Sequence, residues 1–275
     1  MFSVKNQNYI KMTYEQIGLA FLLTMIAGLS TGIGSVLAFF TKHTNTKFLS
    51  SALGFSAGVM LFVSFMELMP TSLADFSKLY GDKLAYLYVL LSFFGGIALI
   101  AVIDFLIPED ENPHETHKVE EVQKKSRLHR MGIMIALSIA IHNFPEGLAT
   151  FIAALDNMEV AIPIVIAIAI HNIPEGIAVS IPIYHATGNK RKAFWYSFLS
   201  GMAEPLGALV GMLFLLPFWS PQLNSVMLAG ISGIMVYISL DELLPSAEKY
   251  GEHHLSILGL IAGMALMGVS LYLLM

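Results

Sequence analysis

The chain has 275 residues, of which 56% are hydrophobic and only 13% are charged, and its mean hydropathy is +0.69. Soluble domains carry about 25% charged residues, so the composition excludes an ordinary soluble domain and predicts a membrane protein. The net charge of −5 comes with no basic patch interleaved with aromatic residues, which argues against nucleic acid as a partner, and the absence of cysteine excludes disulfides and thiolate metal ligands.

Eight apolar runs follow one another along the chain, each long enough to cross a hydrocarbon core of about 30 Å. Because backbone polar groups must be satisfied internally in lipid, we expect each run to be a helix and the fold to be an all-α integral membrane bundle. The expected spans are Ile17–Phe40, Phe48–Met69, Tyr86–Ile107, Met131–Leu155, Val160–Tyr184, Phe194–Leu216, Leu223–Leu244 and Leu255–Met275.

One connection, residues 108–130, is much longer than the others. It is charged, lacks aromatic residues and contains His114, His117 and His129. Such a composition cannot bury a core, so we expect a mobile loop. Its histidines could capture metal, although a solvated loop with incidental histidines is the favoured interpretation. The other connections leave no room for a soluble domain, which predicts a single transmembrane domain over residues 1–275.

Basic residues are distributed unequally between the two sides of the predicted bundle. With the N-terminus outside, 11 of the 15 Lys and Arg residues fall in inside loops and 4 fall outside. Cytoplasmic loops carry the excess of Lys and Arg, so we expect both termini outside the cytoplasm and residues 108–130 inside it. The outside residues are Lys5, Lys11, Lys78 and Lys83.

Two pairs of spans repeat each other. The fourth contains IHNFPEGLA from Ile141 and the fifth IHNIPEGIA from Ile170, at an offset of 29 residues. The second and seventh spans match at Gly58 and Gly233, Met60 and Met235, Ser64 and Ser239, Glu67 and Glu242, and Pro70 and Pro245. Each pair runs in opposite directions, which is typical of alternating-access transporters with a binding site near the midplane. Chance similarity is a stronger alternative for the second pair than for the first.

Five ionisable side chains lie well inside the spans, although each charge costs about 2.5–3.5 kcal/mol to insert. They are His142, Glu146, His171, Glu175 and Glu204. A helix turns by about 100° per residue, so Asn143 lies about 100° and Glu146 about 40° from His142. The carboxylate therefore lies between the imidazole and the amide, one turn along, and the second copy of the motif repeats this order.

We infer two adjoining metal sites from this spacing. The first comprises His142, Glu146, His171 and Glu175, and the second comprises Asn143, Glu146, Asn172, Glu175 and Glu204. Imidazole with carboxylate suits Zn, Fe, Mn, Co or Ni, whereas the all-oxygen set is harder and suits Fe or Mn. The alternatives are that each His-Asn pair only hydrogen-bonds neighbouring helices, and that Glu204 is a protonated core acid.

Proline and glycine follow each His-Asn pair. Pro145 and Pro174 each remove a hydrogen bond to the carbonyl four residues back, which frees backbone oxygen beside the expected site. Gly147 and Gly176 are expected to let neighbouring helices approach closely.

At HNFPEG from His142, HNIPEGIAVSIP from His171 and SGMAEPLGA from Ser200, the chain resembles the ZIP (Zrt-, Irt-like protein) family of divalent-metal transporters, particularly its bacterial members. The resemblance covers nearly the whole chain. It implies a 3+2+3 helix arrangement, an elevator-like movement of spans one, four, five and six, and a two-metal site formed by the seven residues named above. The family varies at His171 and Asn172, which leaves the metal preference open.

The resemblance implies a secondary transporter that brings Zn2+ into the cytoplasm across a bacterial inner membrane, with Fe2+, Mn2+, Co2+ and Cd2+ as further cargo and no catalytic cofactor. An intramembrane metal hydrolase is the alternative of another class, but no HExxH motif is present. A channel would share the same ligands and is distinguished by its flux. Whether the chain forms a homodimer stays open.

Deleting residues 112–126 should lower zinc uptake into proteoliposomes only partly, because we place the transported ion in the spans and not in the loop. Complete loss of uptake in a deletion variant that still folds would contradict this prediction.

Overall fold

The computed structural model describes residues 13–39, 46–105, 125–156, 158–218, 220–249 and 253–274, and every regular element among them is helical. The all-α prediction is therefore confirmed. The α-helices are α1 (Tyr14–Ala38), α2 (Thr46–Val63), α3 (Met69–Tyr80), α4 (Asp82–Phe105), α5 (Lys125–Asp156), α6 (Met158–Thr187), α7 (Lys190–Gly201), α8 (Ala203–Val210), α9 (Pro221–Ile238), α10 (Leu244–Lys249) and α11 (His253–Leu274).

Within this part of the chain, seven helical stretches have the length and hydropathy needed to cross a membrane. They are Tyr14–Ala38, Ser50–Tyr80, Asp82–Phe105, Ile164–Ile181, Lys190–Phe214, Pro221–Glu248 and His253–Leu273. A shorter apolar stretch, Ile139–Leu155, lies in α5 where the fourth span was expected. The spans thus follow in the predicted order, but the second and the seventh continue well beyond Met69 and Leu244.

These two spans continue through α3 and α10, and each contains a π-helical turn just before that continuation. The segment η1 (Ser64–Leu68) leads α2 into α3, and η5 (Ser239–Leu243) leads α9 into α10. In both, the amide after the turn donates a hydrogen bond to the carbonyl of the turn's first serine. Pro70 and Pro245 follow, and a proline favours a wider turn because it has no N–H and its ring clashes with the carbonyl four residues back. The two spans therefore share a backbone irregularity at the positions where their sequences match.

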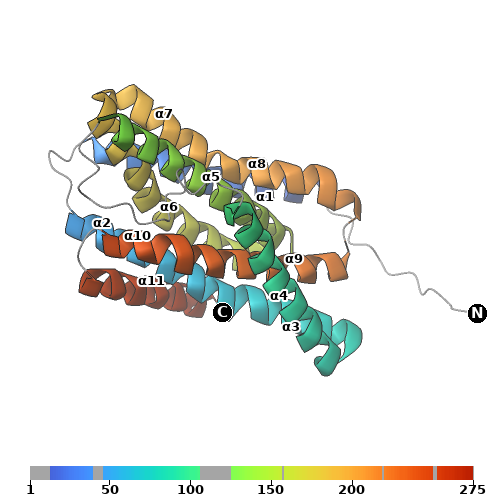
Figure 1. Cartoon of the computed structure of the whole chain (residues 1–275). Helices are drawn as coiled ribbons and strands as arrows, with labels where there is room; N and C mark the ends of the chain where they lie inside the picture. The colour runs from blue at the N-terminus through green and yellow to red at the C-terminus, as the bar shows by residue number, and fades with distance from the viewer. Residues whose placement is uncertain are drawn as a thin grey trace, which may run out of the picture.

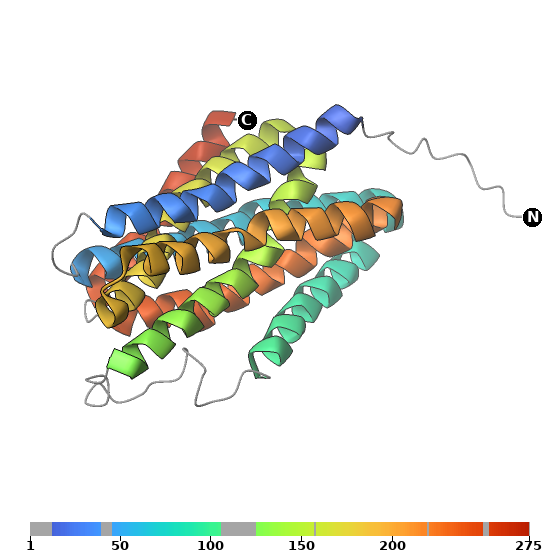
Figure 2. The same ribbon diagram turned by 90° about the horizontal axis from the view of Figure 1, so that it is seen from above.

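The helices form two groups (Figures 1 and 2). In one group α1, α5, α6, α7 and α8 pack against one another, and in the other α2, α3, α4, α9, α10 and α11 do so. The groups meet where α6 contacts α2 and α11 and where α5 contacts α9. The repeated motif of α5 and α6 thus belongs to the first group, with α2 and α9 beside it.

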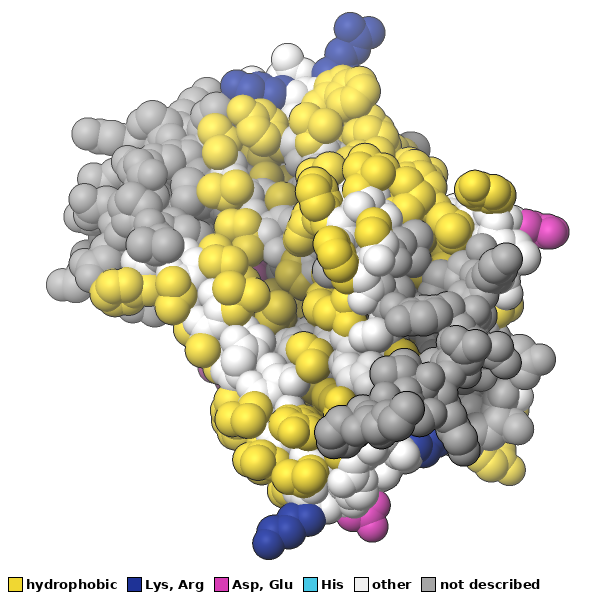
Figure 3. All heavy atoms as spheres, turned by 90° about the vertical axis from the view of Figure 1, so that its right-hand side faces the viewer, with side chains coloured by type: hydrophobic (Ala, Val, Ile, Leu, Met, Phe, Trp, Pro, Cys, Tyr) yellow, Lys and Arg dark blue, Asp and Glu magenta, His cyan; other side chains and the backbone are white. Residues whose placement is uncertain are grey.

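The surface of the bundle is largely apolar. Leu91 and Phe94 of α4 are 63% and 59% exposed, and Leu258 of α11 is 59% exposed. Figure 3, which looks at the right-hand side of Figure 1, shows hydrophobic side chains over much of the described surface and charged side chains at its margin. This surface suits contact with acyl chains rather than with water.

Close helix packing depends on glycine, most clearly between α4 and α9. A Cβ atom on Gly96 would meet the backbone carbonyl of Gly230, so the two backbones touch with no room for a side chain. The preceding residue, Gly95, is exposed and has no atom within 4 Å of the place where its Cβ would lie. Two adjacent glycines of one helix therefore differ only in what they face.

We predict that Gly96→Ala lowers the free energy of unfolding by about 1–3 kcal/mol, because the methyl group forces α4 away from α9. Gly95→Ala is the matched control and should be neutral or stabilising by up to about 1 kcal/mol, since alanine favours the helix. Thermal unfolding of the detergent-solubilised variants measures both effects. Equal unfolding temperatures for the two would contradict this account of the α4–α9 contact.

Candidate metal centre

The two copies of the repeated motif lie on neighbouring helices near the middle of apolar stretches. Helices α5 and α6 are consecutive and pack side by side, so they run in opposite directions. Glu146 lies near the middle of the stretch Ile139–Leu155, and His171 lies near the middle of Ile164–Ile181. Both helices continue through their internal prolines. The motif residues are therefore brought to a similar depth from two directions.

The structure joins the two copies through a buried acid–imidazole contact. His171 Nε2 lies 2.9 Å from Glu146 Oε1, and both residues are fully buried. A carboxylate buried in a medium of low dielectric needs a compensating partner, and an imidazole supplies one. His142 lies on α5 one turn before Glu146, but its side chain is outside the part of the chain that the structure describes.

The two asparagines use their amide nitrogens to bind neighbouring helices. Asn143 Nδ2 donates to the Ser200 carbonyl of α7 at 3.2 Å, and Asn172 Nδ2 donates to the Ala27 carbonyl of α1 at 3.0 Å. Asn172 Nδ2 also contacts Glu204 Oε1 of α8. Among the described residues no donor reaches either asparagine Oδ1, although both oxygens are buried. Buried amide oxygens without a donor fit a cation, for which they are hard ligands.

The remaining two acids are also fully buried. Glu175 accepts a hydrogen bond from Ser56 Oγ of α2 at 2.9 Å, and Glu204 lies in the first turn of α8 beside Asn172. Six of the seven expected ligands therefore lie inside the bundle with no exposed surface. They are Asn143, Glu146, His171, Asn172, Glu175 and Glu204.

Several of these polar groups contact one another directly. In the described part of the chain, no three histidine and acidic side chains converge as a ready-made ion site. Glu146 contacts His171, and Asn172 contacts Glu204.

Glycines next to the acids bring the backbones together, as the sequence predicted. A Cβ atom on Gly147 would strike the backbone of Glu204, and one on Gly176 would strike the carbonyl of Thr31. The first contact sets α5 against α8, and the second sets α6 against α1. Glu204 reaches the motif helices because no side chain separates the backbones there.

Other charged residues and histidines have different surroundings. Glu67 and Glu242 belong to the π-helical turns, and Asp104 accepts a hydrogen bond from Tyr237 at 3.4 Å. His253 contacts exposed Glu248 at 2.8 Å. The loop histidines His114 and His117 lie outside the described residues, and His129 lies on α5 with its side chain undescribed.

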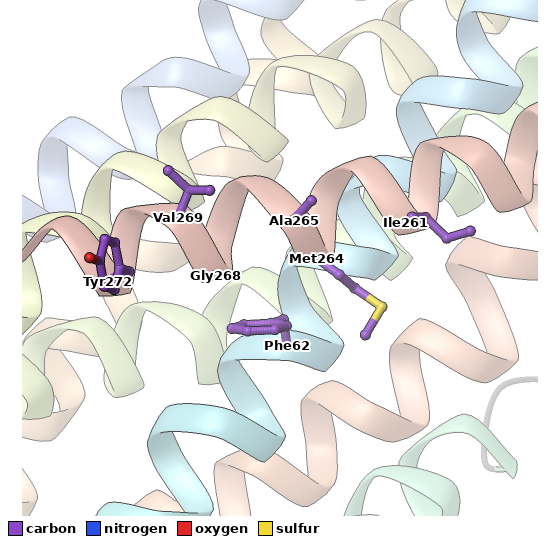
Figure 4. A pocket seen from close by; sticks show the side chains of 7 residues that line it. All are labelled: Phe62, Ile261, Met264, Ala265, Gly268, Val269 and Tyr272. Carbon is purple, nitrogen blue, oxygen red and sulfur yellow. The ribbon is translucent and has the colours of Figure 1, made fainter.

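An apolar groove of about 640 Å³ between α2 and α11 is separate from the polar set. It is lined by Phe62 of α2 and by residues of α11 from Ile261 to Tyr272 (Figure 4), and none of these is an expected ligand. Its lining would suit an acyl chain better than an ion.

Sequence reasoning missed Ser56, which reaches the site from a helix without the motif. The signal that could have indicated it was a single hydroxyl on an otherwise apolar face of the second span.

Comparison with known proteins places the chain in a family. The sequence profile of a family described as ZIP zinc transporters matches residues 108–271. The chain is 60% identical to zinc transporter ZupT of Streptococcus mutans over 255 residues, which cover 92% of this chain and 97% of the relative. It is 56% identical to zinc transporter ZupT of Clostridium perfringens (93% and 95% covered) and 54% identical to that of Campylobacter jejuni (96% and 99%). The chain belongs to the ZIP family of zinc transporters.

Proposed function

We propose that this protein carries Zn2+ into the cytoplasm as a secondary transporter, through a site in the middle of the membrane. The observation that carries the proposal is the fully buried contact between Glu146 and His171, which joins the two copies of the motif. As a member of its family the protein is a transporter and not an enzyme. The proposed ligands are His142, Asn143, Glu146, His171, Asn172, Glu175 and Glu204.

Two adjoining ions would share the glutamates. In this proposal His142 and His171 complete the first position with Glu146 and Glu175, and Asn143, Asn172 and Glu204 complete the second. The buried asparagine oxygens support the second position, because a hard oxygen ligand there would meet a cation and no competing donor among the described residues. Fe2+, Mn2+, Co2+ and Cd2+ would be further cargo.

The direction of transport follows from the charge of the ion. A divalent cation that moves toward a negative interior gains about 4.6 kcal/mol per 100 mV, twice the value for a single charge. The uneven distribution of Lys and Arg between the loops of the two sides supports an orientation with both termini outside a bacterial inner membrane. Entry of the ion also displaces protons from imidazole and carboxylate, so uptake would release protons at the site.

We predict that Glu146→Ala and Glu175→Ala each reduce zinc uptake to the background of protein-free liposomes, because each removes a ligand shared by both ions. The assay is zinc-dye fluorescence in proteoliposomes held inside-negative. Glu248→Ala is the matched control: its carboxylate also contacts an imidazole, at 2.8 Å, but is exposed. Full zinc flux in either buried-glutamate variant would refute the proposed site.

We further predict that Asn172→Ala discriminates between metals. Loss of the amide oxygen should weaken Mn2+ transport about tenfold in apparent affinity, and Zn2+ transport much less, because zinc keeps its imidazole and carboxylate ligands. Competition of unlabelled metals with radioactive zinc measures the relative apparent affinities for Mn2+ and Zn2+. An equal loss for both metals would count against a separate all-oxygen position.

A further inference from the structure

We propose that Ser56 is a positioning residue of the metal site: from α2, its hydroxyl holds the Glu175 carboxylate in the orientation that receives the ion. The inference rests on the proposed function, because it treats Glu175 as a ligand. Its basis is the hydrogen bond from Ser56 Oγ to Glu175 Oε1, 2.9 Å long, between two side chains with no exposed surface.

The hydrogen bond joins the two groups of helices. Glu175 belongs to α6, with the motif, whereas Ser56 belongs to α2, in the other group (Figure 1). By contrast, the bonds of Asn143 and Asn172 stay within the motif's own group. Glu175 is thus a proposed ligand whose orientation depends on a helix outside that group.

The direction of Ser56 is fixed by how α2 packs on α11. Gly54 and Gly58 lie against the backbone carbonyls of Ser256 and Leu260, so this face of α2 is held on α11. At about 100° per residue, Ser56 lies about 160° from both glycines. The packing that anchors α2 therefore turns the Ser56 hydroxyl away from α11 and toward α6.

The surroundings of Ser56 on α2 are apolar. Leu53, Met60 and Val63 lie within about 60° of Ser56 around the helix and are at most 3% exposed. The Glu175 carboxylate therefore meets one hydroxyl, that of Ser56, with apolar side chains on either side of it. Because a charge-assisted hydrogen bond is strongest where water is excluded, the hydroxyl fixes which way the carboxylate plane faces.

A fixed carboxylate favours ion binding because less freedom is lost when the ion arrives. Ser56 is not itself a proposed ligand, so its removal should change how readily the site fills and not how fast the loaded protein moves. We expect Ser56→Ala to raise the KM for zinc about tenfold, the size typical of one lost bond to a charged group, with the maximal rate changed less than about twofold. Ser56→Thr keeps the hydroxyl and should restore the KM.

Ser72→Ala is the matched control. Ser72 is also fully buried and donates to a carbonyl, that of Ser225, at 2.7 Å, but this bond joins α3 to α9 and touches no carboxylate. Its loss should lower the unfolding temperature and leave the KM unchanged. Titration calorimetry of zinc into each detergent-solubilised protein gives a second readout, in which only Ser56→Ala should weaken binding.

Wild-type protein and Glu175→Ala separate failure of this inference from failure of the proposed function. If the wild type takes up zinc, Glu175→Ala does not, and Ser56→Ala has the wild-type KM, the positioning role is overturned and the proposed function stands. If Ser56→Thr has the KM of Ser56→Ala, the hydroxyl is not the active feature and the inference is again overturned. If Glu175→Ala transports zinc at the wild-type rate, the proposed site itself fails.

Discussion

The cost of placing charge in hydrocarbon governs this molecule. Glu146, His171 and Glu175 have no exposed surface, and each lies beside another polar group: the first two contact each other, and Glu175 accepts from Ser56. An ionised group buried alone would cost several kcal/mol, so the polar side chains must gather in one place to be tolerated. The same gathering is what a divalent ion requires. Contacts between these side chains offset the cost of burying them, and the same side chains are those that we propose bind the cation.

The buried polar side chains can lie close together because the helix backbones approach closely at glycine. Gly147 touches the backbone of Glu204 and Gly176 touches the carbonyl of Thr31, so α5 packs closely on α8 and α6 packs closely on α1. The contacts of Glu146 with His171 and of Asn172 with Glu204 could each be replaced by contacts with an ion. A tetrahedral thiolate cage would hold zinc too tightly to release it. This protein has no cysteine, and its proposed ligands are imidazole, carboxylate and amide groups, which bind zinc less tightly than thiolates and so favour its release.

The sequence predicted the order of the spans because hydropathy and length decide which segments enter lipid. It also predicted that the motif helices face each other, since two antiparallel copies of one pattern place like residues at like depth. It did not predict the π-helical turns, because a one-residue change of hydrogen-bond register leaves hydropathy unaltered, although Pro70 and Pro245 mark both places. Nor did it find Ser56. Which hydroxyl meets Glu175 depends on the way α2 packs on α11, and that is a tertiary property.

The hydrogen bonds of the candidate site are divided unequally between the two groups of helices. Those of Asn143 and Asn172, and the contact of Glu146 with His171, remain inside the group that carries the motif. Relative movement of the groups would leave these bonds intact, because both partners of each bond would move together. The bond from Ser56 to Glu175 crosses between the groups and would have to break. The hydroxyl that we propose orients Glu175 for the ion is therefore also a polar link between the two groups of helices.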